Sequence, residues 1–138
     1  MFSNILVAVD GSESANKAFE RAIYLAQKCN SKLDLVHVVQ CDLGGDSANT
    51  FEIVEELKDQ AKKMLDEYKK QAAKNGIPIQ LTIVQGDPAK VIIDLAKAKS
   101  YDLIIMGTRG RSAFKELLIG SVSQKVMHHA TCPVMVVR

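Results

Sequence analysis

Three features are scarce in this chain of 138 residues: net charge, cysteine and long apolar runs. The net charge is only +2 and no run of Lys or Arg is long, which argues against a nucleic-acid-binding surface. No apolar run reaches membrane-spanning length, and the apolar start, residues 5–9, is too short for a signal-peptide core. Cys29, Cys41 and Cys132 are odd in number and form no C-x-x-C pair, which argues against a disulfide framework or a zinc site. These absences predict a cytoplasmic protein with reduced thiols and no nucleic-acid or membrane partner.

Strand-like and helix-like patterns alternate along the chain. Continuous apolar runs predict strands buried on both faces, and apolar residues at helical spacing predict amphipathic helices between them. The expected strands are residues 4–10, 32–39, 77–84, 101–107 and 132–137. The expected helices have apolar stripes over 15–26 and 54–72 and extend over 86–99 and 121–129, and residues 41–50 are a loop by composition. This alternation predicts one α/β domain over residues 1–138, with a Rossmann-like open parallel sheet of five strands and helices on both faces.

Local signals mark several helix ends. Ser12 or Ser14 can cap the first helix, and Asp87 followed by Pro88 predicts the start of the third. Gly76 is the expected stop after the long second helix.

Unusual residues follow the first and fourth expected strands. Val9-Asp10-Gly11-Ser12 follows the first, and a glycine-rich stretch with Gly107, Gly110 and Gly120 follows the fourth. Each stretch leads toward a helix N-terminus, where unpaired amides favour an anion, and glycine lets a ligand approach the backbone. Because open parallel sheets bind ligands beyond the carboxyl ends of their strands, the three glycines and Ser121 predict a phosphate cradle there.

Two familiar phosphate-binding motifs do not fit. The chain has no Gly-Lys-[Ser/Thr] tripeptide, so it has no Walker-type loop. Asp10-Gly11-Ser12 stands where the dinucleotide fingerprint would place Gly-x-Gly-x-x-Gly. The pattern present is instead Gly, two residues, Gly, nine residues, Gly-Ser.

This pattern and its flanking segments resemble the universal stress protein family, in particular its ATP-binding subgroup. The resemblance extends over essentially the full length of the chain and includes the segments "ILVAVDGSESA", "LVHVV", "GDPAKVIIDLA", "YDLIIMGTRGRS" and "GSVSQKVMHHATCPVMVV". It implies a sheet of order 3-2-1-4-5, a dimer, and an adenine nucleotide (ATP, or ADP or AMP) at the ends of strands one and four.

By position, the resemblance also implies which residues contact the nucleotide. Asp10 is expected on its ribose and metal side, with Mg²⁺ or Mn²⁺ as the ion. No catalytic residue is implied. The expected nucleotide contacts are Val9, Asp10, Val38, Val39, Met106, Gly107, Arg109, Gly110, Gly120, Ser121, Val122 and Ser123.

Several polar residues in or near these segments can also be explained by the fold alone. Asp10 can cap the first helix as well as contact ribose or metal. Arg109 and Arg111 are either solvated loop charges or phosphate contacts. His37 is interpreted as a packed, hydrogen-bonded core histidine.

The remaining small and edge residues carry structural expectations. Cys29 and Cys132 are interpreted as small core residues. The last strand is apolar on both faces and, at the sheet edge, would aggregate unless covered. A homodimer through Pro133 to Val137 is the simplest cover.

The leading hypothesis is a regulatory stress-response protein that binds ATP with a divalent ion and is read by an unknown protein partner. Neither loop has a second carboxylate or a Gln to orient an attacking water, so at most slow hydrolysis is expected. Two alternatives stay open: a nucleotide-hydrolysing enzyme on the same fold, and a nucleotide-free protein-interaction module.

Overall fold

The computed structural model describes residues 1–40, 48–108 and 120–138, which form five strands and four helices. In chain order these are β1 (Asn4–Ala8), α1 (Glu13–Cys29), β2 (Lys32–Val39), α2 (Ala48–Lys74), β3 (Ile79–Gln85), α3 (Pro88–Ala98), β4 (Leu103–Gly107), α4 (Ser121–His129) and β5 (Val134–Val137). The strands form one parallel sheet of order β3-β2-β1-β4-β5. The alternating pattern and the expected strand order are therefore confirmed.

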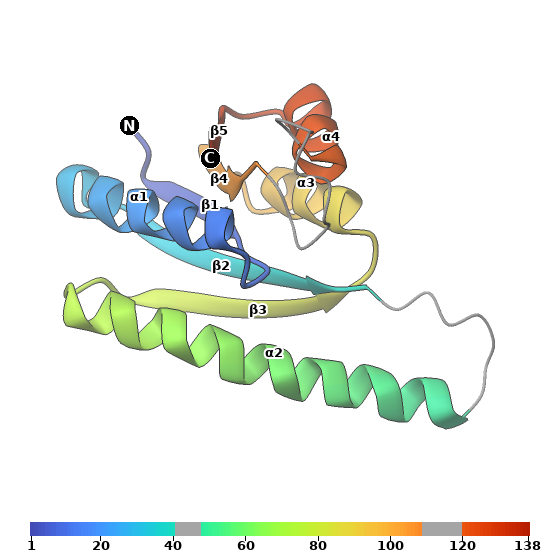
Figure 1. Cartoon of the computed structure of the whole chain (residues 1–138). Helices are drawn as coiled ribbons and strands as arrows, with labels where there is room; N and C mark the ends of the chain where they lie inside the picture. The colour runs from blue at the N-terminus through green and yellow to red at the C-terminus, as the bar shows by residue number, and fades with distance from the viewer. Residues whose placement is uncertain (41–47, 109–119) are drawn as a thin grey trace.

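Two apolar layers enclose the sheet because successive strand residues point to opposite faces. In β1, Ile5 and Val7 pack in the layer with α1 and α2, whereas Leu6 packs in the layer with α3 and α4. All three side chains are fully buried. Figure 1 shows α2 lying along β3 at one edge of the sheet. Burial of each such side chain contributes about 1.5–3 kcal/mol to folding.

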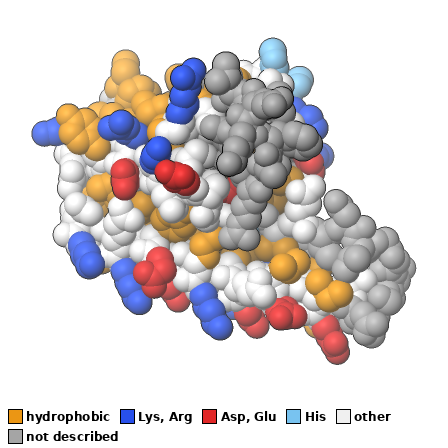
Figure 2. Space-filling view, in the orientation of Figure 1, with side chains coloured by type: hydrophobic (Ala, Val, Ile, Leu, Met, Phe, Trp, Pro, Cys, Tyr) orange, Lys and Arg blue, Asp and Glu red, His pale blue; other side chains and the backbone are white. Residues whose placement is uncertain are grey.

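The outer face of α2 carries charges of both signs, which Figure 2 shows along the lower edge of the molecule. This helix carries two ion pairs, Lys58–Glu55 at 3.9 Å and Lys70–Glu67 at 3.5 Å. In each pair the two partners lie about one helical turn apart. Exposed pairs of this kind contribute little to stability, and their main effect is a solvated helix face.

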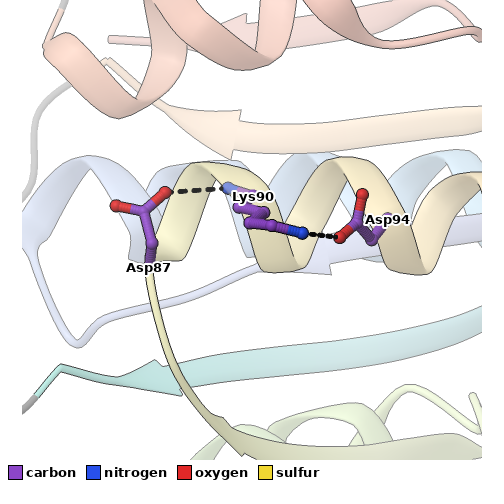
Figure 3. A network of polar contacts seen from close by, with 3 residues as sticks. All are labelled: Asp87, Lys90 and Asp94. Atoms are coloured by element: carbon purple, nitrogen blue, oxygen red, sulfur yellow. Dashed lines mark hydrogen bonds and ion pairs between the residues drawn. The ribbon is translucent and has the colours of Figure 1, made fainter.

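The helix-end signals act as the sequence predicts. Ser12, the first of the two candidate serines, caps α1, and its Oγ accepts a hydrogen bond from the Ala15 amide at 3.2 Å. Asp87 caps α3 and accepts from the Lys90 amide at 3.0 Å (Figure 3). On the same helix the Lys90 ammonium donates to Asp94 at 2.7 Å, and this contact raises the pKa of Lys90. Gly76 follows α2 with a φ of +70°.

Several element ends differ from the predicted ones; β4, β5 and α3, for example, each begin two residues later than expected. The first strand ends at Ala8 instead of Asp10, because the chain turns away there through Gly11, whose φ is +80°. The third strand covers 79–85 instead of 77–84. Helix α2 begins at Ala48, inside the expected loop. The sequence obscured this start because Asn49 and Thr50 are poor helix formers.

The prediction that Cys29 is a core residue is wrong. The buried stripe of α1 ends at Ala26, and the last turn, which includes Cys29, is exposed. Cys132 is half-buried, and this burial together with Asp102 raises the pKa of its thiol. The Cys132 thiol is therefore held in its protonated, less reactive form.

The edge position predicted for the last strand is confirmed. β5 pairs with β4 along one side, and its four residues are all half-buried. In the described part of the chain no helix is both long and apolar enough to cross a membrane.

Candidate functional site

A cavity of about 540 Å³ lies at the carboxyl ends of the central strands. The chain runs from β1 to β3 toward one edge and then returns to place β4 beside β1, so the strand order reverses between β1 and β4. This reversal point is where open parallel sheets form a ligand crevice. The cavity volume lies within the range typical of small-molecule sites.

The cavity brings together ten of the twelve residues expected to contact a nucleotide. Arg109 and Gly110 lie outside the described residues, as does Arg111. The ten are Val9, Asp10, Val38, Val39, Met106, Gly107, Gly120, Ser121, Val122 and Ser123.

The turn after β1 is shaped by Asp10. Its Oδ1 accepts a hydrogen bond from the Ser12 amide at 2.9 Å, so this carboxylate closes an Asx turn, and Ser12 is the helix cap. Among the described residues the other oxygen, Oδ2, has no hydrogen-bond partner. Asp10 therefore shapes the turn with one oxygen, while the other has no partner among the described residues.

Gly107, at the end of β4, lacks a side chain for a reason within the fold. A Cβ built there would lie 2.3 Å from the Ser14 Oγ, 2.7 Å from the Ser14 carbonyl carbon and 2.8 Å from the Ala15 nitrogen. The start of α1 thus packs directly against Gly107. Close packing of α1 accounts for this glycine by itself, without any ligand approaching the backbone.

The N-terminus of α4 opens onto the same cavity. Gly120 is its N-cap and has no side chain to cap the first turn, and its own amide donates to the Thr108 carbonyl. The first helical hydrogen bond is made by the Gln124 amide. Within the described part of the chain, the amides of Ser121 to Ser123 therefore have no acceptor. Gly120 has a φ of −73°, which any residue adopts, so the backbone conformation does not require glycine at this position.

Ser123 holds this helix terminus on the sheet. Its Oγ donates to the Gly107 carbonyl at 2.8 Å, and the residue is only 3% exposed. The hydroxyl of Ser123 is thus engaged in a structural hydrogen bond.

His37 is a cavity residue that the sequence interpretation missed. It is half-buried rather than buried, it lines the cavity, and its Nδ1 lies 2.8 Å from the Val9 carbonyl oxygen. The expectation of a hydrogen-bonded histidine was right, but the core position was wrong. The strand pattern of β2 gave no sign that this side chain lies beside the turn after β1.

Apolar side chains from two helices complete the walls. Leu57, Ala61 and Met64 of α2 and Pro88 and Ile92 of α3 line the cavity. The three α2 residues lie far from any strand end in the sequence, so strand-end reasoning could not have identified them.

The donor chemistry limits what the cavity can hold. In the described part of the chain no group of three or more His, Cys, Asp or Glu side chains is placed to hold a metal ion. Asp10 is the one carboxylate among the described cavity residues. The arrangement fits a ligand with an anionic group at α4, an apolar portion against α2 or α3, and a hydroxyl or an ion near Asp10.

The chain is similar to universal stress proteins over its whole length. The model of the universal stress protein family matches residues 1–138. Universal stress protein YxiE of Bacillus subtilis is 37% identical over 148 aligned positions, which cover 100% of each chain. The solved structure of universal stress protein UspA from Lactobacillus plantarum has a TM-score of 0.90 and 29% identity, covering 99% of this chain and 98% of that chain.

Two other solved relatives contain an adenine nucleotide. A universal stress protein family protein from Arabidopsis thaliana with AMP bound is 25% identical, has a TM-score of 0.71, and covers 98% of this chain and 90% of that chain. A universal stress protein in complex with cAMP is 25% identical, has a TM-score of 0.76, and covers 99% of this chain and 97% of that chain.

Proposed function

The chain belongs to the universal stress protein family, and on that premise we propose that its cavity binds an adenine nucleotide. ATP is the proposed ligand, with ADP and AMP as alternative occupants. The bound state would regulate a protein partner in the stress response. Two relatives that contain AMP and cAMP support the ligand class.

The observation that carries this proposal is the uncapped start of α4. Three amides, of Ser121, Val122 and Ser123, point along a helix terminus whose dipole favours negative charge. A phosphate group would supply the acceptors that the first turn lacks. Arg109 and Gly110 belong to the same proposed set on the ground of the sequence pattern alone.

Asp10 is the residue proposed to face the ribose and a divalent ion. Mg²⁺ is commonly held by one or two carboxylates together with substrate phosphates, and it does not need a cage of protein ligands. A single carboxylate with one unpaired oxygen beside the proposed phosphate site fits that chemistry. Mg²⁺ or Mn²⁺ would neutralise phosphate charge there.

The proposed role is regulatory rather than catalytic. Efficient phosphoryl transfer needs a metal, positioned positive charge and a group that orients the attacking water. Among the described cavity residues only one carboxylate is present and no Lys or Arg is. We therefore expect at most slow ATP hydrolysis, below the rate of about 1 per second at which dedicated enzymes begin.

Two further parts of the proposal concern assembly and location. The half-buried edge strand β5 supports a homodimer through Pro133 to Val137. The free thiols of Cys29 and Cys132 support a cytoplasmic location.

Calorimetric titration with ATP and AMP, with and without Mg²⁺, tests the proposed nucleotide site. Gly120→Asp and Gly120→Asn form a matched pair, because both side chains cap α4 and only Asp adds negative charge. We expect the nucleotide Kd of Gly120→Asp to exceed that of Gly120→Asn by about tenfold. Wild-type protein that binds neither nucleotide at millimolar concentration would overturn the proposal and favour a nucleotide-free interaction module.

A further inference from the structure

We propose that His37 is a positioning residue of this site: its imidazole holds the Val9 carbonyl and thereby fixes the turn that presents Asp10. The inference rests on the proposed function, since it assigns His37 a part in nucleotide binding. It concerns a side chain that lies on β2, whereas the turn that it holds follows β1.

The hydrogen bonds around Val9 show how the strand end is fixed. The last paired residues of β1 and β2 are Ala8 and Val36. One residue further along, the Val9 amide donates to the Val36 carbonyl at 3.0 Å, and the Val9 carbonyl lies 2.8 Å from Nδ1 of His37. Val9 is thus held to β2 on both sides, through main chain at its amide and through a side chain at its carbonyl.

The geometry also assigns the proton on the histidine ring. A carbonyl oxygen can only accept a hydrogen bond, so Nδ1 of His37 must carry the hydrogen. Val9 is only 4% exposed, which means that water has little access to replace the imidazole. Loss of the ring would therefore leave a shielded carbonyl without its donor.

Asp10 comes immediately after the bond that His37 makes. The turn continues through Gly11 with a φ of +80° and closes with the 2.9 Å bond from the Ser12 amide to Asp10. The short segment between Val9 and Ser12 is therefore pinned at its start by His37 and at its end by the Asx turn. Release of the first contact would let the Asp10 carboxylate move relative to the N-terminus of α4.

A direct contact between the ring and the ligand is the competing explanation. His37 lines the cavity, and its Nε2 has no hydrogen-bond partner among the described residues. The two explanations assign the function to different ring nitrogens. The amide nitrogen of Asn can occupy the place of Nδ1, whereas the longer Gln side chain reaches the place of Nε2.

The experiment compares His37→Asn, His37→Gln and His37→Leu in calorimetric titrations with AMP, with melting temperature as the check on folding. We expect His37→Asn to bind AMP within about threefold of wild type, and His37→Gln and His37→Leu to raise the Kd about fivefold to tenfold. Retention by Gln with loss in Asn would overturn the inference in favour of direct contact. An unchanged Kd in all three variants, or an equal loss in all three, would also overturn it.

Amide chemical shifts of the nucleotide-free protein separate this inference from the proposed function. We expect His37→Leu to shift the amide resonances of Asp10, Gly11 and Ser12, and His37→Asn to leave them near their wild-type positions. Shifts confined to residues next to position 37 would contradict the positioning role even if AMP binds. If His37→Leu shows these shifts but the wild-type protein binds no AMP, the nucleotide site would be overturned instead, and with it the role of His37 in binding.

A double-mutant cycle tests whether His37 acts through Asp10. If His37 acts through the turn, the effects of His37→Leu and Asp10→Ala on AMP affinity will not add, because the second change removes the group that the first one misplaces. Additive effects would contradict the inference.

Discussion

Gly107 and Ser14 touch so closely that a single methyl group at position 107 would lie 2.3 Å from the Ser14 hydroxyl oxygen. Two backbone atoms of α1, the Ser14 carbonyl carbon and the Ala15 nitrogen, would lie within 2.8 Å as well. A side-chain hydroxyl can rotate away, but the helix backbone cannot. The contact therefore fixes the start of α1 against the end of β4.

Gly107→Ala should lower the free energy of unfolding by about 2–3 kcal/mol, because the helix must shift to admit the methyl group. Denaturant unfolding of the variant and wild type measures the change. Gly76→Asn is the matched control: Gly76 has a φ of +70° with open space around it, and Asn tolerates that conformation. We expect the free energy of unfolding of the control to stay within about 0.5 kcal/mol of wild type.

A loss of unfolding free energy in Gly107→Ala that is smaller than the loss in the control would refute the close contact.

Ser123→Ala should destabilise the protein by about 1 kcal/mol. The substitution removes the 2.8 Å hydrogen bond to the Gly107 carbonyl and leaves that acceptor without its donor. Ser121→Ala, at an exposed position in the same helical turn, is the control and should change stability by less than about 0.5 kcal/mol. Thermal and denaturant unfolding both report the difference. Equal effects of the two variants would show that the Ser123 hydroxyl does not anchor α4.

Tyr101 should make the stability of the protein fall at alkaline pH. The side chain is 7% exposed and donates a hydrogen bond to Asp34. Burial, and then the bond to Asp34, raise its pKa above the ordinary value of 10.0. The folded state thus keeps a proton that the unfolded chain releases, so the stabilisation is complete below pH 10 and is lost as pH rises beyond it.

Unfolding free energies of wild type and Tyr101→Phe at a series of pH values above and below 10 test this prediction. Phe cannot titrate, so the variant should show the shallower loss above that pH. Parallel curves for the two proteins would mean that Tyr101 loses its proton as readily in the folded state as in the unfolded chain.

The edge strand should carry the proposed dimer contact. The Pro133 carbonyl accepts from Ile104 of β4 and the Val137 carbonyl accepts from Thr108, just after β4. The alternate residues Val134 and Val136 therefore direct their main-chain groups outward. Val136→Pro removes an outward amide without removing a bond to β4, and we expect the dimer Kd to rise more than about tenfold. Sedimentation analysis measures this change. Phe51→Ala is the control: it removes an exposed apolar side chain from α2 and should leave the dimer Kd unchanged. A wild-type monomer would contradict the dimer outright.

Local sequence signals predicted most of the fold because each acts over a few residues. Asp87 and Pro88 define the start of α3 by their own chemistry, and the continuous apolar runs required strands covered on both faces. The start of α2 was missed because Asn49 and Thr50 have weak helix propensity and the first apolar residue of the helical stripe is Val54.

The candidate site was predictable only where it follows from strand ends. Strand-end residues such as Asp10 and Gly107 line the cavity because the carboxyl ends of parallel strands meet at one edge. His37 could not be assigned from the sequence, since its partner Val9 is 28 positions away and belongs to another strand. The spatial requirement at Gly107 was hidden for the same reason: it comes from α1.

Thr108 links two parts of the molecule that are otherwise distant in the chain. Its carbonyl accepts from the Gly120 amide at the start of α4, and its amide donates to the Val137 carbonyl at the end of β5 at 2.8 Å. The residue is 5% exposed, so both bonds are shielded from water. A single residue therefore ties the N-terminus of α4 to the last residue of β5, so a displacement of either element would pull directly on the other.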